Sequence, residues 1–375
     1  MQYRSFGKHD IKVSALGFGA MRMPTIETDQ GQEIDEAESI KMIRHAIDSG
    51  VNYIDTAYPY HNGMSELLVG KALKNGYREK TYLATKCPVW EIHKPEDFDR
   101  ILDEQLEKLD TPYIDFYLLH ALNMDHWNNK VLKYDLLTKM ENAKKSGKIK
   151  YIGFSFHDNA KSFITMIDGY DHWDFCQIQL NYIDVDNQAT IKGMEYAASK
   201  GLGIVIMEPL LGGKLASPPM NVASILKDSK TPVEWALNFL WDRPEVSLLL
   251  SGMSDMTQTT DNITYADRSS IGMLSEEDLS MLAEAKQIYD TMALVSCTKC
   301  AYCMPCPFGL DIPTTFEAYN RTATVGMEKA GAFYSSIETK ADACKKCKKC
   351  ESVCPQKIKI SEVMGTITDV FLQGA

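Results

Sequence analysis

The 375-residue sequence lacks the features that would direct a protein out of the cell or into a membrane. Its first segment, MQYRSFGKHDIK, is too polar for a signal peptide, and the apolar stretch from Ile204 to Leu211 is interrupted by Glu208. Positive charge is also in deficit, because 51 acidic residues outnumber 40 basic ones and leave a net charge of -11. We therefore expect a cytoplasmic protein with no membrane span and no nucleic-acid partner.

Recognisable linkers and nucleotide fingerprints are missing as well. The segment GFGAM, which contains Gly17 and Gly19, is not a dinucleotide-binding fingerprint, and no flavin-binding motif is found. No Gly/Ser-rich linker divides the chain. A composition of 45% hydrophobic and 24% charged residues is that of an ordinary globular protein, with room for one large domain and one small domain.

Cysteine is scarce in most of the chain but concentrated in two short runs that follow residue 296. The second run reads C-x2-C-x2-C-x3-C-P, the bacterial ferredoxin spacing in which the last cysteine of a run ligates the other cluster. Zinc sites and disulfides also use C-x2-C pairs and stay open as alternatives. The crossing rule predicts one 4Fe-4S cluster on Cys297, Cys300, Cys303 and Cys354, and a second on Cys344, Cys347, Cys350 and Cys306.

Lysines interleave with the second run as CKKCKKC. Lys345, Lys346, Lys348 and Lys349 could attract an acidic ferredoxin or flavodoxin-type electron carrier, or help to hold an anionic cluster. A solvated loop is the alternative. Because the stretch between the runs, Ile312 to Ala343, favours helix, we expect an α-helical ferredoxin-like domain over residues 291–375.

Residues 1–290 alternate short apolar strands with amphipathic helices. A hairpin is expected at Tyr3–Val13, and a last helix at Glu276–Met292. This pattern predicts a (β/α)8 TIM barrel, with a doubly wound parallel sheet as the alternative. The expected strands are Ala15–Gly19, Tyr53–Thr56, Thr81–Thr85, Ile114–Leu119, Tyr151–Ser155, Phe175–Leu180, Gly203–Met207 and Val246–Leu250, and the expected helices include Glu36–Asp48, Pro95–Leu109, Tyr134–Ser146, Gln188–Ser199 and Pro232–Trp241.

Polar side chains stand at the ends of consecutive predicted strands. Asp55 follows the second strand, with Tyr60 in the next loop, while Lys86 and His120 end the third and fourth strands. In a TIM barrel these ends surround the active-site mouth. A buried Asp-Lys pair can also be purely structural, but four such residues at matching ends favour a catalytic site.

Several segments together carry a family resemblance: GVNYIDTAYPYHNGMSE, ATK, YLLH, IGFSFHD and CTKCAYCMPCP. The chain resembles an aldo-keto reductase, in the branch with a C-terminal 4Fe-4S ferredoxin-type domain. The resemblance implies an NAD(P)-dependent oxidoreductase that interconverts a small-molecule carbonyl and an alcohol by hydride transfer. It makes Asp55, Tyr60, Lys86 and His120 the catalytic tetrad, with Tyr60 as general acid/base.

The same resemblance implies a nicotinamide site. Ser155 and Gln177 match the residues that hold the carboxamide, and Met207 occupies the ring-stacking position. Positions that often carry Lys and Arg are Gly252 and Gln258 here, so NADP and NAD both remain open. The expected cofactor-binding residues are Gly19, Met21, Arg22, Ser155, Gln177, Met207, Pro209, Leu210, Gly212, Lys214, Ser251, Gly252, Met253, Gln258, Asp261 and Asn262.

The role of the two clusters in the function stays open, because iron-sulfur clusters can relay electrons or can stabilise the structure. A ferredoxin-linked electron-transfer oxidoreductase is therefore one alternative, and a redox-sensing nicotinamide-binding protein is another. A hydride carries two electrons and each cluster moves one, so coupling them requires a mediator. Candidate walls of the substrate site are Trp90, His93, Trp127 and Tyr182.

Overall fold

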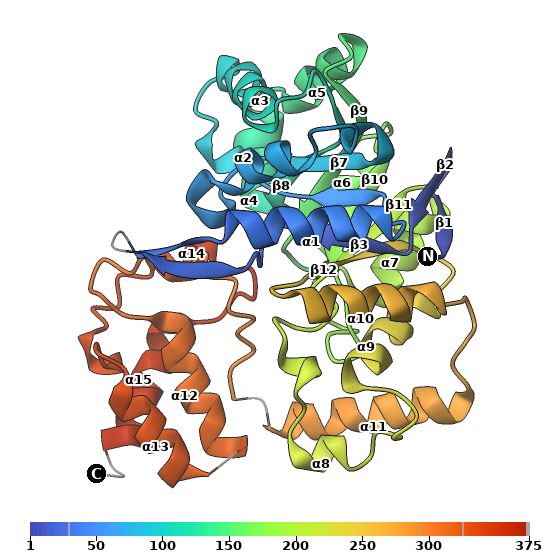
Figure 1. Cartoon of the computed structure of the whole chain (residues 1–375). Helices are drawn as coiled ribbons and strands as arrows, with labels where there is room; N and C mark the ends of the chain where they lie inside the picture. The colour runs from blue at the N-terminus through green and yellow to red at the C-terminus, as the bar shows by residue number, and fades with distance from the viewer. Residues whose placement is uncertain (29–30, 293, 325, 373–375) are drawn as a thin grey trace. The chain divides into compact units, whose positions relative to one another are not determined.

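A computed structural model describes residues 1–28, 31–292, 294–324 and 326–372 (Figure 1). The chain divides into two compact units. Unit 1 contains Met1–Leu210 and Val233–Ser275, and unit 2 contains Leu211–Pro232 and Glu276–Ala375. The boundary between residues 290 and 291 that the sequence suggests stays a prediction.

Unit 1 is built on a closed barrel of parallel strands, which confirms the predicted fold class (Figure 1). Neighbours around the barrel are neighbours in sequence, and β12 closes the ring by pairing with β3. The barrel strands are β3 (Leu16–Gly19), β6 (Tyr53–Asp55), β7 (Tyr82–Cys87), β8 (Ile114–Leu122), β9 (Ile149–Phe156), β10 (Phe175–Gln179), β11 (Gly203–Met207) and β12 (Val246–Gly252).

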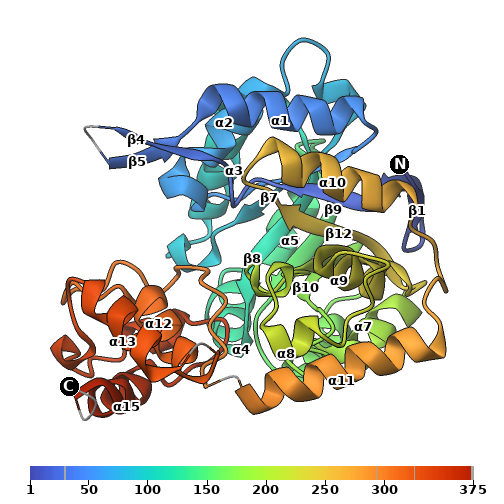
Figure 2. The same ribbon diagram turned by 60° about the horizontal axis from the view of Figure 1, so that its bottom comes forward.

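Helices surround this barrel, and α1 and α10 lie side by side on it (Figure 2). α1 begins at the N-cap Asp35, whose side chain accepts a hydrogen bond from the Glu38 amide, and it buries Met42 and Ile43. The longer helices of unit 1 are α1 (Glu36–Asp48), α2 (Ser65–Ala72), α3 (Glu96–Leu109), α5 (Leu136–Lys145), α6 (Ala160–Asp168), α7 (Thr190–Ser199), α9 (Pro232–Trp241) and α10 (Met256–Asp267). No helix within the described ranges is both long enough and apolar enough to cross a membrane.

Two antiparallel hairpins accompany the barrel. The first, β1 (Tyr3–Phe6) with β2 (His9–Ser14), confirms the predicted hairpin. Its Phe6 belongs to the same apolar cluster as the inward-facing residues of the barrel, so this hairpin plugs one end. The second, β4 (Thr25–Thr28) with β5 (Gly31–Ile34), lies between β3 and α1 and was not predicted.

Unit 2 is helical around its own apolar core, and α12 and α13 pack against each other (Figure 1). The core includes Phe316, Ile360 and Met364, and several of the cysteines pack against it. Tyr334 stacks on Phe371 with ring centroids 4.1 Å apart. The helices of unit 2 are α8 (Met220–Ala223), α11 (Glu276–Met292), α12 (Ile312–Thr324), α13 (Met327–Ser336), α14 (Lys349–Val353) and α15 (Ile360–Leu372).

Candidate active site and iron-sulfur sites

The barrel interior changes from apolar to polar along its axis. Tyr53, Ala84, Leu118, Phe175 and other inward-facing side chains form one apolar cluster. Because side chains alternate along a strand, the residue two positions later points to the same face. The next inward positions toward the carboxyl ends of the eight strands, beyond this apolar cluster, are Gly19, Asp55, Lys86, His120, Ser155, Gln177, Met207 and Gly252.

Lys86 is a member of this polar ring and is fully buried. Its Nζ donates hydrogen bonds to Asp55 Oδ1 at 2.7 Å, to the Thr56 carbonyl at 2.8 Å and to the Tyr60 hydroxyl at 3.3 Å. Three acceptors match the three protons of an ammonium group. Tyr60 reaches this position from the short helix Tyr60–Gly63 in the loop after β6.

His120 completes the group from the neighbouring strand and is also buried. Its ring centroid lies 6.1 Å from that of Tyr60 and 5.1 Å from that of Trp90. His126 flanks the same region, with its Nδ1 2.9 Å from the Ala121 carbonyl oxygen. The structure thus brings all four predicted tetrad residues together, with an aromatic wall beside His120.

Burial shifts the pKa values of three of these residues. Desolvation lowers the pKa of Lys86 and raises the pKa of Asp55, and the contact between the two opposes each shift. Desolvation, reinforced by the Lys86 ammonium, holds the pKa of His120 well below its ordinary value. His120 is therefore a neutral imidazole at physiological pH.

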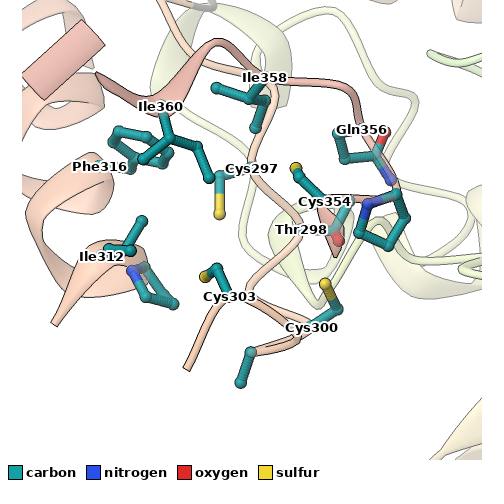
Figure 3. A pocket seen from close by; sticks show the side chains of 13 residues that line it. Cys297, Thr298, Cys300, Cys303, Ile312, Phe316, Cys354, Gln356, Ile358 and Ile360 are labelled. Carbon is teal, nitrogen blue, oxygen red and sulfur yellow. The ribbon is translucent and has the colours of Figure 1, made fainter. Parts of the chain in front are cut away.

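The first cysteine set lines a cavity in unit 2. Cys297, Cys300, Cys303 and Cys354 contribute to its walls, and Figure 3 shows their thiols turned toward the same space. The remaining wall is mainly apolar and includes Phe316. Among the described residues, no three His, Cys, Asp or Glu side chains are arranged to hold a single metal ion. The thiols instead surround a volume, and an all-cysteine donor set suits an iron-sulfur cluster.

A second cavity of unit 2 is lined by the other four cysteines. Cys306 joins Cys344, Cys347 and Cys350 in its walls, together with apolar residues such as Met364. Cys354, the last cysteine of the second run, thus lines the cavity of the first run, and Cys306, the last of the first run, lines the cavity of the second. The crossing rule predicts this arrangement. Burial raises the pKa of Cys350 to about 11, so its thiol must lose a proton when it ligates metal.

Comparison with known proteins identifies both parts of the chain. The family model described as "Aldo/keto reductase family" matches residues 15–287. The chain belongs to the aldo/keto reductase family. It is accordingly an oxidoreductase enzyme, and a second model, "4Fe-4S dicluster domain", matches residues 293–358.

Relatives and solved structures agree with this family. L-galactose dehydrogenase of Arabidopsis thaliana is 26% identical over 323 residues, which cover 77% of this chain and 95% of that protein. Aldo-keto reductase YhdN of Bacillus subtilis is 34% identical over 41% of this chain and 47% of its own length. The thermostable aldo-keto reductase Tm1743 has a TM-score of 0.64 at 25% identity, covering 76% of this chain and 100% of that one.

Within this reductase barrel, the residues expected at the nicotinamide carboxamide lie on adjacent strands. Ser155 on β9 accepts a hydrogen bond from the Ala121 amide at 2.8 Å. Gln177 on β10 donates to the Met207 sulfur at 3.5 Å, while its buried Oε1 has no partner among the described residues. A buried acceptor without a donor fits a ligand that carries an amide N–H group.

The reductase places a cation beside Gly252. A Cβ at this glycine would lie 2.7 Å from the Arg22 Cγ, so the Arg22 side chain occupies the space that a larger residue would need. Nearby, Asn262 donates to Ser251 Oγ at 3.1 Å, and Gln258 is tied to Asp255 at the N-cap of α10. Met21 is half-buried, Met253 is buried, and Asp261 is exposed on α10.

The segment after β11 divides between the units. Met207, Pro209 and Leu210 belong to unit 1, whereas Gly212 and Lys214 belong to unit 2. Gly212 has a φ of +63°, and a Cβ there would meet the Thr298 carbonyl oxygen at 2.3 Å. The close approach to the loop of the first cysteine run therefore requires glycine. Cofactor roles for these residues stay predictions.

Sequence reasoning missed one polar residue at the barrel mouth, and the structure gives the surroundings of the expected wall residues. Gln179 lies two positions beyond Gln177 on the same face of β10, and strand alternation was the signal that could have found it; His157 directly follows β9, two positions beyond Ser155. Of the expected wall residues, Trp90 lies beside His120. Trp127 and Tyr182 are buried, packing near Trp173 and Phe239 respectively, and His93 is exposed.

Proposed function

We propose that this reductase interconverts a carbonyl and an alcohol by hydride transfer with NADP(H) or NAD(H), using Tyr60 as the general acid/base. The supporting observation is the contact at 3.3 Å between Tyr60 and the buried Lys86 ammonium. The bound nicotinamide supplies or accepts the hydride. In the reducing direction, the carbonyl oxygen gains negative charge and takes its proton from the Tyr60 hydroxyl.

The neighbours of Tyr60 prepare it for this step. A free phenol with a pKa of about 10 is a poor acid near neutral pH, and a nearby cation favours its phenolate form. Lys86 supplies that cation, and Asp55 at 2.7 Å holds the ammonium in place. Neutral His120 has one N–H group that can donate to the carbonyl oxygen and orient it.

The coenzyme is proposed to lie along the polar ring. Gln177, with its unpartnered Oε1, and Ser155 would hold the carboxamide, and the Met207 sulfur would pack on the ring. Arg22 beside Gly252 supplies a cation where the sequence has lost one, which supports NADP(H) alongside NAD(H). Aldo-keto reductases from Klebsiella pneumoniae in complex with NADP and acetate, and in complex with NADPH, share the barrel fold.

The test is the Tyr60→Phe variant, which removes only the hydroxyl. We expect kcat for carbonyl reduction to fall about 100- to 10,000-fold, while coenzyme Kd changes less than about twofold. Tyr58→Phe is the matched control, because Tyr58 is in the same loop but donates to Glu104 at 3.3 Å. Assays with NADPH and NADH identify the preferred coenzyme. A Tyr60→Phe enzyme with near wild-type kcat would refute the assignment.

The proposed metal content is two 4Fe-4S clusters, held in the two cysteine-lined cavities of unit 2. Each would provide a site for one electron at a time. Anaerobic reconstitution should yield about eight iron and eight sulfide per chain. A single bound zinc ion, with no sulfide, would contradict the proposal.

A second candidate function is electron exchange with an external acidic carrier of the ferredoxin or flavodoxin type. Cys347 is exposed, and so are Lys345, Lys346, Lys348 and Lys349 around it, so a cationic surface surrounds the second cysteine set. Anaerobic titration followed by EPR separates the two roles of the clusters. Reduction by NAD(P)H supports electron transfer, whereas reduction by dithionite alone supports a structural role.

A further inference from the structure

The turn that carries Tyr60 has a rarely used backbone conformation. In the short helix Tyr60–Gly63, the residues His61, Asn62 and Gly63 have φ angles of +50°, +55° and +85°. Only the last of them is glycine, the residue that adopts such angles without strain. Left-handed backbone at the other two positions persists where the surroundings fix it, and it occurs preferentially at functional sites. The contacts of the His61 side chain contribute to that fixation.

The His61 ring contacts the loop that follows β3, which we call loop 20–23. The Met23 backbone amide donates a hydrogen bond to His61 Nε2 at 3.2 Å, across 38 residues of sequence. Because an N–H group can only donate, Nε2 must carry a lone pair, and a neutral ring then has its proton on Nδ1. Met23 is buried and His61 is half-buried, so this bond is partly shielded from water.

Two further hydrogen bonds join loop 20–23 to the segment that contains the turn. The Ala20 amide donates to the Asp55 carbonyl at 2.8 Å, before the turn. Ser65 Oγ donates to the Ala20 carbonyl at 3.1 Å, after the turn. The bond of His61 lies between these two in sequence. It therefore attaches the middle of the turn, next to Tyr60, the proposed proton donor.

Arg22 is the charged neighbour of the His61 ring among the described residues. It lies in the same loop, directly before Met23, and its Cγ occupies the space beside Gly252. Burial lowers the pKa of His61 and the Arg22 charge lowers it further, while a hydrogen bond with the Met21 backbone acts in the opposite direction. The net effect places the pKa below 6.5, so the ring is neutral at physiological pH.

A proton on the His61 ring has two consequences for this contact. Protonation occupies the Nε2 lone pair, so the ring can no longer accept from the Met23 amide. It also places a second positive charge beside Arg22. The hydrogen bond is thus present above the pKa of His61 and is lost as the pH falls through that value.

We propose that His61 is a positioning residue that fastens the Tyr60 turn to loop 20–23 only while its ring is neutral. Protonation at Nε2 releases the Met23 amide, so the turn loosens and proton transfer from Tyr60 slows in acid. This inference rests on the proposed reductase function and adds an acid-sensitive control of Tyr60 to it.

Two substitutions in the reconstituted full-length enzyme separate the hydrogen bond from the proton. His61→Gln offers an amide oxygen in place of Nε2 and does not titrate, whereas His61→Leu removes the acceptor. At pH 7.5 we expect kcat for carbonyl reduction to fall less than about threefold in His61→Gln but at least about tenfold in His61→Leu, because small displacements of a catalytic group are costly.

The pH profile is the readout that a merely structural role would not change. Between pH 7.5 and 5.0, the wild-type kcat divided by the His61→Gln kcat should fall about threefold. Taking the ratio at each pH cancels acid effects on the rest of the enzyme. His172→Gln is the matched control, since His172 is exposed in the turn before β10. The ratio of wild type to this control should stay near one across the same range.

Hydrogen exchange of the Met23 amide, followed by mass spectrometry, tests the contact without turnover. At pH 7.5 the amide should exchange faster in His61→Leu than in the wild type, and at pH 5.0 faster in the wild type than in His61→Gln. Comparing proteins at one pH cancels the intrinsic pH dependence of exchange. Urea unfolding checks that each variant is folded, and if His61→Leu is not, the comparison with His61→Gln alone decides.

Two results would overturn the role of His61 while leaving the reductase function standing. One is a ratio of wild-type to His61→Gln kcat that stays constant from pH 7.5 to 5.0, and the other is equal Met23 exchange in these two proteins at pH 5.0. If the wild type reduces no carbonyl compound at any pH with either coenzyme, the reductase proposal fails. The role of His61 in proton transfer then fails with it, whatever the exchange shows.

Discussion

His120 shows how one buried side chain makes the stability of the barrel depend on pH. Burial and the Lys86 ammonium hold its pKa well below 6.5 in the folded chain. The unfolded chain keeps the ordinary pKa of about 6.5. As the pH falls below about 6.5, the imidazole of His120 therefore becomes protonated in the unfolded chain but stays neutral in the folded chain. The free energy of unfolding decreases as the pH falls through this range.

We predict that His120→Asn weakens this pH dependence. Between pH 7.5 and 5.5, the free energy of unfolding of the wild type should drop by about 1.4 kcal/mol more than that of the variant. Urea unfolding followed by tryptophan fluorescence measures this, because all five tryptophans belong to unit 1. Equal pH responses in the two proteins would show that His120 titrates normally when folded.

The positions of the tetrad residues could be anticipated because each relates simply to a strand. Asp55 and Lys86 follow β-branched or aromatic runs whose ends are readable from sequence, and strand alternation then sets their direction. The bond between His61 and Met23 could not be anticipated. It depends on a left-handed backbone and on a partner from another segment, which no local pattern encodes.

At the scale of elements, strand β7 is fixed on both of its faces. Lys86 points into the barrel, while the preceding Thr85 points outward and donates to Glu66 of α2 at 2.7 Å. Gln105 of α3 donates to Glu66 Oε1 at 2.6 Å and to the Lys86 carbonyl at 3.1 Å, and it accepts from Tyr117 of β8 at 2.7 Å. A buried amide thus joins two helices to two strands behind the proposed catalytic lysine.

Replacing that amide should destabilise unit 1 strongly. Gln105→Met keeps the volume but removes the amide oxygen that accepts from the Tyr117 hydroxyl and one of the two donors to Glu66 Oε1, so we expect a loss of about 2–4 kcal/mol. Gln32→Met on the exposed strand β5 should change stability by less than about 0.5 kcal/mol. Urea unfolding at pH 7.5 compares the two. Similar effects at both positions would mean that the buried bonds contribute little.

Element prediction succeeded where the pattern was strong. β11 matches its predicted bounds, and α1 and α9 do as well, because caps, prolines and apolar runs mark their ends. The hairpin of β4 and β5 escaped notice because its strands, TIET and GQEI, are polar and exposed and carry no burial signal. Exposed pairing leaves little trace in hydrophobic periodicity.

At the scale of the whole molecule, the division into units does not follow chain order. The segment Leu211–Pro232 leaves the barrel after β11 and belongs with the cysteine-containing unit, where Gly212 approaches Thr298. Contacts between residues fifty or more positions apart, such as Lys227 with Asp278 and Gly212 with Thr298, accompany this division, and local sequence patterns do not report them. The ligand sets of the clusters, unlike the division into units, could be predicted from the sequence, because the ferredoxin cysteine spacing is typical of crossed ligation.

Ligand crossing yields a test with two pairs of substitutions. If one cluster is bound in each of the two cavities, Cys303 and Cys354 ligate the same cluster, whereas Cys344 and Cys354 ligate different clusters. Cys303→Ala with Cys354→Ala should then leave about four iron per chain. Cys344→Ala with Cys354→Ala should damage both clusters and leave fewer. If each run instead held its own cluster, the two results would be exchanged.

Iron and sulfide analysis, with EPR of the dithionite-reduced protein, distinguishes the two arrangements. Cys176→Ala is the control, because Cys176 is buried in β10 and should leave about eight iron in place. The result also bears on the fold of unit 2. Cys354 follows α14 and packs in the apolar core, so a crossed ligand set joins the two cysteine runs of that unit through metal. Thermal unfolding should therefore shift downward in both double variants, and more in the one that loses both clusters.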